Sequence, residues 1–588
     1  MRLPSVISPD FFRRRLANVE ALPQLALLAG LTGLLTGAVI LLFRYLIEQV
    51  LANWFLAGDY EAFETLNALQ RTGYAVGGAL LVGLALAALS RDTRRVGVVH
   101  VMERLSRHQG YLPLRNALVQ FLGGIAALAS GQSGGREGPS IHLGAAAASV
   151  LGQTFRLPNN SIRTLVGCGT AAAIASSFNT PMAGVIFAME VVMMEYTIGS
   201  FIPVIIAAVT STFLTHLVLG NEPAFTIAPL QLMSLAETPF IILAGVLIGA
   251  VAAGFIALIQ MFASFGNWPI VGRMALAGTI TGALALHTPE IMGVGYDTVS
   301  AAMLGQLTLT ALFVIAIAKL VASAAATGLG MPVGLIGPTL VIGAALGAVM
   351  AQVGRWFDPA VMSGDGFYVM LGMSAMMAAV LQAPLAALVS VLELTANPNV
   401  ILPAMLIIVV ATMITSEVFK SESVFLRTLR TLGLEYPPSP VTQHLSRVGV
   451  TALMERSFQR LPAEVSISAS QEALKRSPRW ILIDSADGDV RTVLDASDLR
   501  AYLDDLQDDA SAKVSDTEDA PSINLLRIPG MRKDIGNVDS RATLQEALLE
   551  LRSKRVEALC VKRYSAPMIK PIIGVLTKDQ IDSYREVG

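Results

Sequence analysis

The sequence predicts an all-α polytopic membrane domain with an internal repeat, followed by a soluble α/β domain. Three observations predict it: an apolar composition, charges gathered near the C-terminus, and two long apolar segments that resemble each other. Of 588 residues, 53% are hydrophobic and 15% are charged, and the mean hydropathy is +0.60. These values are typical of membrane proteins with several spans. Residues 441–588 nevertheless hold 44 of the 86 charged residues, so we predict a membrane domain over 1–436 and a soluble part over 437–588.

Long apolar runs within residues 1–436 predict the membrane spans. A helix needs about 20 apolar residues to cross the hydrocarbon core. Gly and Pro interrupt these runs more often than they interrupt simple spans, so we expect short, tilted or re-entrant helices. The charge-free runs that are long enough include residues 164–189, 320–354 and 366–392.

The apolar part contains a duplication. The segment GPSIHLGAA at 138–146 resembles GPTLVIGAA at 337–345, and residues 169–190 align with 372–393 without a gap. Duplicated halves with matched helix breaks are typical of transporters and channels that bind a solute near the middle of the membrane. The two predicted halves cover approximately residues 22–220 and 236–434.

Each half has a Gly-rich turn before a Gly-Pro helix start, GREGP at 135–139 and GLIGP at 334–338. Pro suits the first helical turn because its missing N–H would have no partner there. The free backbone N–H groups and the positive end of the helix dipole favour a bound anion. Glu137 lies at such a start, so its carboxylate can occupy the site in place of an anion, leave when protonated, and act as a gate. The alternative is an Arg136–Glu137 ion pair that only caps the helix, but ionisable residues inside membranes are usually functional.

Other polar residues of the membrane domain have structural readings as well as functional ones. Glu190 and Glu393 occupy equivalent places near the ends of repeated helices, where a role on a proton path and a bond to nearby backbone both stay open. His142 is expected to pack within its helix. Cys168 and Cys560 lie in different domains, so we expect two packing residues and no disulfide.

Charge and motifs exclude several classes of function. The net charge of −2 and the pI near 6.3 give no basic surface for nucleic acid. The turn at 131–138 lacks the GK[ST] ending of a phosphate-binding loop, there is no HExxH, and no GxSxG elbow follows a strand. The six His residues are scattered, so we expect neither a metal site nor a resident cofactor in the membrane domain. A membrane-embedded enzyme is only a remote alternative.

These motifs resemble those of the CLC family of chloride channels and chloride/proton exchangers. GREGP is close to the gating-glutamate motif of that family, and the resemblance extends from roughly Leu22 to Leu434. It implies an inverted repeat, with Glu137 as the external gating glutamate. It also implies a homodimer with one anion pathway in each subunit and dimer contacts from helices around 180–215 and 383–419.

The resemblance also assigns residues to the anion. Val96 stands where the family usually has the Ser of Gly-Ser-Gly-Ile-Pro, Phe425 stands where it usually has a Tyr, and Ile336 replaces a Phe. Losing both hydroxyls leaves backbone donors and apolar walls, which should weaken or alter selectivity because a bound anion gives up its hydration. Chloride is the expected anion, with nitrate, bromide and fluoride left open. The residues assigned to the anion are Val96, Gly97, Gly138, Leu335, Ile336 and Phe425.

Proton coupling depends on a second, inward-facing carboxylate in most exchangers of the family. Its position, directly after Glu190, is Val191 in this chain. An apolar residue there is typical of channel-type members, although some exchangers lack the carboxylate. We therefore expect a passive chloride conductance gated by Glu137, with proton-coupled chloride exchange as the alternative.

The soluble part contains a second duplication that resembles a pair of CBS domains. SQEALKR at 470–476 matches LQEALLE at 544–550, and short apolar runs alternate with helical patterns, which indicates an α/β unit used twice. We expect CBS domains at 437–505 and 521–588, joined by an acidic linker at 506–520.

CBS pairs can bind adenine nucleotides through an Asp placed three residues after a Ser, Thr or Asp. Asp495 and Asp498 fit that spacing, whereas Thr577 is followed at the same distance by Gln580. One half-site is therefore predicted, and nucleotide sensing and purely structural support both stay open.

Basic residues predict the orientation in the membrane. Arg13–Arg15 and a second cluster of Arg91, Arg94 and Arg95 favour the cytoplasmic side, and a charged soluble domain fits the same side. The basic start has no small-residue cleavage signature, so a removed signal peptide is not expected. We expect a multi-pass protein of the cell membrane with both termini in the cytoplasm.

Overall fold

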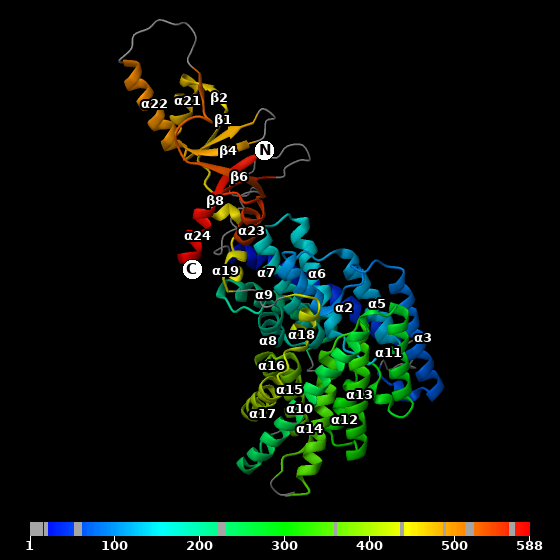
Figure 1. The fold of residues 1–588 in the computed structure, drawn as a ribbon. Helices are drawn as coiled ribbons and strands as arrows, with labels where there is room; N and C mark the ends of the chain where they lie inside the picture. The colour runs from blue at the N-terminus through cyan, green and yellow to red at the C-terminus, as the bar shows by residue number, and fades with distance from the viewer. Residues whose placement is uncertain are drawn as a thin grey trace. The chain divides into compact units, whose positions relative to one another are not determined.

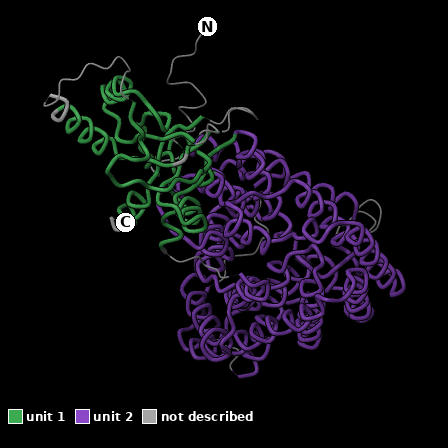
Figure 2. The backbone as a smooth tube through the Cα atoms, turned by 45° about the horizontal axis from the view of Figure 1, so that its top comes forward, with its two compact units in different colours: residues 1–24, 156–161, 438–588 green, residues 25–155, 162–437 purple. Residues whose placement is uncertain are grey.

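The chain divides into two compact units. A computed structural model describes residues 16, 22–51, 61–221, 225, 231–357, 362–434, 440–485, 490–511, 522–563 and 571–587. The membrane unit consists of residues 25–155 and 162–437, and the soluble unit consists of 1–24, 156–161 and 438–588 (Figure 2). The predicted boundary near residue 436 and the basic cluster Arg13–Arg15 lie outside the described residues.

The membrane unit is built from helices, apart from one β-bridge, as far as the structure describes it (Figure 1). Short π-helical stretches, Ala188–Met193 and Ile414–Val418, continue α8 and α17. The first half contains α2 Leu22–Val50, α3 Ala68–Ala87, α4 Gly97–Arg107, α5 Leu114–Ala129, α6 Glu137–Thr154, α7 Asn159–Phe178, α8 Pro181–Phe187 and α9 Ile198–Leu219. The second half contains α10 Thr238–Ala263, α11 Ile270–Ala285, α12 Tyr296–Met303, α13 Leu309–Leu329, α14 Ile336–Gly354, α15 Asp365–Leu381, α16 Pro384–Thr395 and α17 Ile401–Met413, and α18 Val424–Thr431 follows it.

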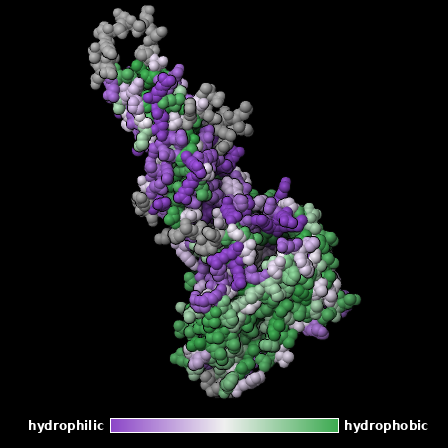
Figure 3. Space-filling model, viewed as in Figure 1, coloured by the Kyte–Doolittle hydropathy of each residue, from purple (hydrophilic) through white to green (hydrophobic). Residues whose placement is uncertain are grey.

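The surface of this unit suits a hydrocarbon environment. Among the described residues, six helices are long and apolar enough to cross a membrane. Large apolar side chains such as Leu27, Leu81 and Phe313 are exposed on it, and green, apolar atoms cover much of the unit in Figure 3. Contact with lipid would surround these side chains with apolar groups instead of water.

The long apolar runs are broken where Gly and Pro predicted breaks. Asn179 and Gln382, which are equivalent in the repeat, have left-handed backbone with φ of 62° and 55°, and a new helix begins two residues after each. The run at 320–354 breaks at Gly330, where φ is 90°. The expectation of short, interrupted helices is confirmed.

The two halves run in opposite directions. Helices α3 and α11 hold equivalent places in the order of the halves, and they pack against each other. Gly83 near the end of α3 faces Met274 near the start of α11, whereas Gly282 near the end of α11 faces Thr72 near the start of α3. Equivalent helices that are antiparallel make the duplication an inverted repeat.

The soluble unit holds the predicted α/β duplication. Its main sheet has the order β1-β3-β4-β6-β7-β8, in which β1–β3 and β6–β7 are parallel and β3–β4, β4–β6 and β7–β8 are antiparallel. A second sheet pairs β2 with β5. The strands are β1 Phe458–Pro462, β2 Glu464–Ser466, β3 Trp480–Asp484, β4 Val490–Asp495, β5 Ser522–Asn524, β6 Arg532–Asp539, β7 Ala558–Lys562 and β8 Ile572–Thr577. The helices are α19 Pro440–Ser446, α20 Val450–Leu453, α21 Ile467–Leu474, α22 Ala496–Ser511, α23 Leu544–Lys554 and α24 Lys578–Val587.

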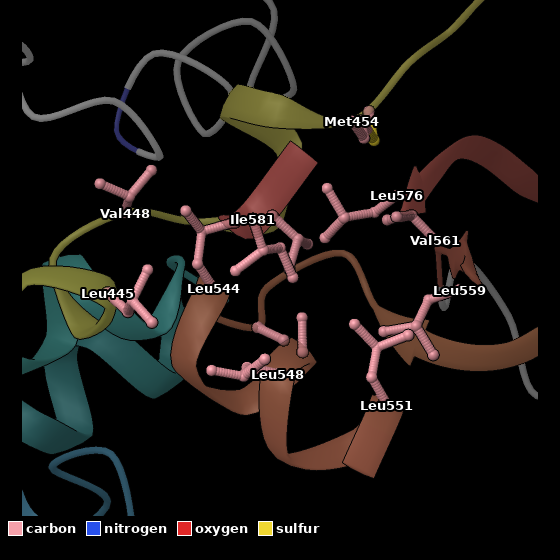
Figure 4. Close-up of a cluster of buried hydrophobic side chains, with 13 residues drawn as sticks. Leu445, Val448, Met454, Leu544, Leu548, Leu551, Leu559, Val561, Leu576 and Ile581 are labelled. Atoms are coloured by element: carbon pink, nitrogen blue, oxygen red, sulfur yellow. The ribbon is translucent and has the colours of Figure 1, made fainter. Parts of the chain in front are cut away.

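Each half of the soluble unit has its own apolar core. In the second half, Leu544, Leu548 and Leu551 project from α23 toward Leu576 and Ile581 (Figure 4). Burial of these side chains outside water is the main stabilising contribution to the half.

The structure corrects the predicted linker. Helix α22 continues to Ser511, so residues 506–511 are helical. The rest of the acidic segment, 512–520, lies outside the described residues. Asp and Glu in that segment gave it the composition of a solvated linker, but acidic residues are also tolerated on the exposed face of a helix.

Candidate anion site at two helix N-termini

The two Gly-Pro helix starts meet. Gly135 and Gly334 form an antiparallel β-bridge, in which each N–H donates to the other's carbonyl at 2.7 Å. Gly138 is so close to Gly334 that a Cβ on Gly138 would lie 2.7 Å from the Gly334 Cα. Only glycine permits this approach. Two helix N-termini with their free amides and positive dipole ends therefore lie side by side.

Glu137 occupies this place itself. Its side chain is fully buried, Oε1 accepts a hydrogen bond from the Tyr296 hydroxyl at 2.6 Å, and Oε2 accepts one from the Gly337 backbone N–H at 3.2 Å. Gly337 lies in the first turn of α14, the helix of the other half. The carboxylate thus bonds to a first-turn amide of one helix start while its own residue belongs to the other.

Arg136 has partners other than a helix cap. Its guanidinium bonds to the Glu48 carboxylate at 3.2 Å and lies 5.6 Å from the centre of the Tyr296 ring. Phe178 and Phe225 pack around that ring at 6.1 and 5.7 Å between centroids. The aromatic packing holds the Tyr296 hydroxyl against Glu137.

Lys319 on α13 bonds to the turn that precedes Tyr296. It is fully buried, and its Nζ donates to the carbonyls of Ile291, Gly293 and Val294 at 3.0, 2.9 and 3.2 Å. These carbonyls belong to the turn that leads into Tyr296, so Lys319 holds the turn and brings a positive charge close to the site.

Sequence reasoning missed both Tyr296 and Lys319. A signal for Lys319 was present, because it is the one charged residue in the apolar stretch 309–329, and such residues are usually functional. Tyr296 carried no comparable signal, since a tyrosine after a Gly-rich turn has many ordinary explanations.

Two of the remaining residues assigned to the anion lie at the start of α4 and on α18. Val96 is extended and precedes α4, which begins at Gly97 with φ of 81°. Phe425 is buried on α18, and α4 packs against both α6 and α18. Neither Val96 nor Phe425 brings a side-chain hydrogen-bond donor.

A narrow cavity begins at the start of α14. Ile336, the first residue of that helix, lines it, and its polar groups are the hydroxyls of Thr180 and Ser390. Most of the wall is apolar. The other lining residues are Ile174, Phe178, Phe187, Leu340, Met377 and Leu394.

Glu190 and Glu393 bond to backbone, each in the opposite half. Glu190 accepts from the N–H groups of Leu385 and Ala386 at the start of α16, and Glu393 accepts from Met182 and Ala183 at the start of α8. The four distances run from 2.7 to 3.2 Å. Of the two readings of these carboxylates, the bond to nearby backbone is the one that the geometry displays.

Val191 and His142, two other predicted positions, are both buried. Val191 is apolar, and His142 has a hydrogen-bond partner. Val191 is 5% exposed in the π-helical stretch after α8 and offers no group that carries a proton. His142 Nε2 lies 2.9 Å from His100 Nδ1 on α4, and the two rings stack. His142 is thus a packed residue with a specific partner.

The soluble unit brings the predicted nucleotide half-site and the equivalent positions of its second half into one pocket of about 750 Å³. Asp495, Asp498, Thr577 and Gln580 all line it, together with Trp480. Pockets of this volume are typical of small-molecule sites. The other lining residues are Leu453, Arg479, Ser497, Met531, Lys533, Asp579, Ser583 and Tyr584.

The pocket contains two cations, and one of them, Lys533, forms an ion pair with Asp579. The Arg479 guanidinium and the Lys533 ammonium each lie 5.8 Å from the centre of the Trp480 ring. The Trp480 indole N–H is buried and has no partner among the described residues. The Asp498 carboxylate accepts from the Met531 N–H at 3.2 Å.

Comparison with known proteins identifies relatives of the membrane unit. A model of the family described as voltage gated chloride channel matches residues 78–416. The putative chloride channel protein ClcB-like of Ralstonia nicotianae is 31% identical over 426 residues, which cover 70% of this chain and 99% of the relative. The H(+)/Cl(-) exchange transporter ClcA of Yersinia pestis is 29% identical over 419 residues, 68% of this chain and 86% of the relative. A slow cyanobacterial Cl-/H+ antiporter of known structure aligns with a TM-score of 0.62 at 22% identity, over 70% of this chain and 99% of its own.

Proposed function

The chain belongs to the voltage gated chloride channel family, the CLC family, and from that premise we propose that it is a chloride/proton antiporter in which Glu137 is both gate and proton carrier. Proteins of this family transport anions and are not enzymes, so the enzyme alternative is excluded. The chain is a multi-pass membrane protein. Its predicted orientation, with both termini in the cytoplasm, is part of the proposal.

The passive conductance expected from Val191 is the less supported reading. A relative that matches 68% of the chain is an H(+)/Cl(-) exchange transporter, so the family resemblance favours coupling. One apolar side chain at Val191 removes one carboxylate from one position, and protons also move along ordered water and other polar groups. We infer that protons reach Glu137 from the inner side without a carboxylate at residue 191.

The observation that carries the proposal is the bond between Glu137 and the Gly337 N–H. An ionised carboxylate and a chloride ion compete for the same amides and helix ends. When Glu137 takes up a proton, it loses most of its attraction to the amide and leaves, and an anion replaces it. When the anion leaves, Glu137 returns and releases its proton, so proton and anion movements are linked at one site.

The test is transport by the purified protein in liposomes, with chloride flux and pH followed together. An imposed chloride gradient should drive protons uphill in the wild type. Glu137→Gln should abolish proton movement and leave chloride flux, because the amide cannot take up a proton at neutral pH. Glu237→Gln is the matched control, since Glu237 is a buried carboxylate elsewhere in the unit that accepts from Ser363 and Tyr368. Uphill proton movement that survives in Glu137→Gln would contradict the proposal, and its absence in the wild type would restore the passive reading.

Chloride is the proposed anion. Backbone amides and apolar walls discriminate weakly among monovalent anions compared with a full set of hydroxyl donors, so nitrate and bromide are expected to compete with chloride. Flux of chloride in the presence of nitrate, bromide or fluoride measures this. A site that carries only fluoride would contradict the assignment.

We also propose that the protein is a homodimer with contacts on helices around 180–215 and 383–419. Exposed apolar side chains such as Phe213 and Leu402 in these segments support an apolar interface. Light scattering of the detergent-solubilised protein should give the mass of two chains, and a mass of one chain would contradict the interface.

The second proposed site is an adenine nucleotide site in the pocket of the soluble unit. Trp480 can stack on the base, Arg479 and Lys533 can bind phosphate, and Asp495 or Asp498 can accept from ribose hydroxyls. Added ATP or AMP should raise the unfolding temperature of the full protein. The shift should be lost in Asp498→Ala and kept in Asp504→Ala, which changes another Asp on the same helix. The absence of any shift would favour structural support by the CBS-like pair.

A further inference from the structure

We propose that Glu61 is a titratable residue whose carboxylate sets the charge at the mouth of the Glu137 site and so controls the access of anions. The inference rests on the proposed function, because it requires that anions reach Glu137 through this mouth. Glu61 follows α2, so it lies at the opposite end of that span from Leu22. With the predicted cytoplasmic N-terminus, this end is the external one.

Glu61 is connected to Glu137 through two neighbouring residues of α12. The Glu61 Oε2 accepts a hydrogen bond from the Asp297 N–H at 3.0 Å. Asp297 directly follows Tyr296, whose hydroxyl donates to Glu137. Glu61 and Glu137 therefore bond to adjacent residues in the first turn of α12, and any charge on Glu61 acts close to the gate.

Glu61 shares its cations with the gate. The charges that act on it come from three elements: Asp297 at the start of α12, Arg136 at the start of α6, and Lys319 on α13. Lys319 also interacts electrostatically with Glu137. Two positive charges that attract an anion toward the site are thus within reach of the Glu61 carboxylate.

Glu61 changes its charge within the physiological range of pH. Burial, and next the neighbouring Asp297 carboxylate, raise the pKa of Glu61 to about 7, while Arg136, Lys319 and the Asp297 N–H act in the lowering direction. Below that pH the neutral carboxyl leaves the field of Arg136 and Lys319 intact. Above it, the carboxylate offsets that field and repels an approaching anion. Anion access should therefore fall as external pH rises through about 7.

A purely structural role is the competing explanation, because a carboxylate on the Asp297 N–H also caps α12. Glu61→Gln separates the two. The Gln amide oxygen can accept the same N–H, so the cap is kept while the titration is lost. Glu64→Gln is the matched control, since Glu64 lies three residues after Glu61 with an exposed side chain, and the charges that act on it are those of Asp297, Glu290 and Arg71.

The experiment measures chloride exchange in liposomes at equal pH on both sides, from pH 6 to pH 8.5, in the Glu137→Gln background. That background has no proton-carrying gate, so the remaining pH dependence belongs to other groups. With Glu61 present, flux should fall roughly three- to tenfold, with a midpoint near pH 7. Adding Glu61→Gln should make the profile flat at the level of pH 6, and adding Glu64→Gln should leave the fall in place.

A second variant tests the sign of the interaction. Asp297→Asn removes the charge that opposes ionisation of Glu61, so the midpoint of the fall should move to lower pH. An unfolding temperature in detergent equal to that of the background shows that each variant is folded.

The outcomes separate this inference from the proposed function. A profile of Glu61→Gln that superimposes on its background would overturn the role of Glu61 and leave the antiporter proposal untouched. Uphill proton movement in Glu137→Gln would overturn the proposed function instead.

Discussion

Tyr296→Phe removes the hydroxyl that holds Glu137 and leaves the ring packed between Phe178 and Phe225. The lost bond is short, 2.6 Å from hydroxyl to carboxylate oxygen, and its acceptor is ionised when the gate is closed. Hydrogen bonds to charged groups contribute roughly 1.5–3 kcal/mol. Since 1.4 kcal/mol corresponds to a factor of ten, the ratio of closed to open gate should fall about 10- to 150-fold.

The assay is the initial rate of chloride efflux from liposomes at pH 7.5, with equal amounts of reconstituted protein. If release of Glu137 limits transport, the rate in Tyr296→Phe should rise, by up to that factor until another step becomes limiting. Fewer protons should also move for each chloride, because the gate spends less time in its site.

The control is Tyr368→Phe. The Tyr368 hydroxyl is also buried and donates to a carboxylate, Glu237, at 2.8 Å, so the control removes the same chemistry from a different place. It should leave the rate and the coupling unchanged. A Tyr296→Phe rate no higher than that of the wild type, or an equal rise in both variants, would refute the argument that this bond holds the gate closed.

Four further variants test the architecture of the membrane unit. Glu190→Gln and Glu393→Gln should each lower the free energy of unfolding by about 0.5–2 kcal/mol. The two effects should be similar because the two carboxylates make equivalent bonds. Thermal unfolding in detergent measures them, and a tenfold smaller effect in one variant would argue against equivalent caps. Gly138→Ala should abolish chloride flux, since its Cβ would lie 2.7 Å from the Gly334 Cα; normal flux would mean that the two helix starts can separate. Lys319→Met should destabilise the protein by roughly 3 kcal/mol or more, because three carbonyls, two of them in buried bonds, lose their donor. An unchanged unfolding temperature would contradict its role as support for the turn.

Local patterns carried much of the prediction. Gly-Pro after a Gly-rich turn specifies a helix start from a few adjacent residues, since the missing N–H of Pro and the small size of Gly act within one turn. The repeat then doubled that signal, which led to Glu137 and to the amides around Gly138 and Ile336. The α/β duplication of the soluble unit was legible for the same reason, because alternating apolar runs are local.

Coupling was the weak point of the sequence-based prediction. It depended on a single position, Val191, whereas proton movement depends on every polar group and water molecule along a path. One residue type cannot represent such a path. Glu190 illustrates the same limit, because only its contacts with Leu385 and Ala386 reveal what its carboxylate binds.

By itself, the sequence determined that this chain has paired helix starts inside a membrane and a carboxylate at one of them. Only the tertiary structure decided what holds that carboxylate. Tyr296 lies 159 positions away from Glu137 in the sequence. Lys319 belongs to α13, and Glu61 belongs to the segment after α2. The physical reason is that helix starts arise from neighbouring residues, whereas hydrogen bonds and charge interactions act through space and take whichever partners the fold brings within a few ångströms.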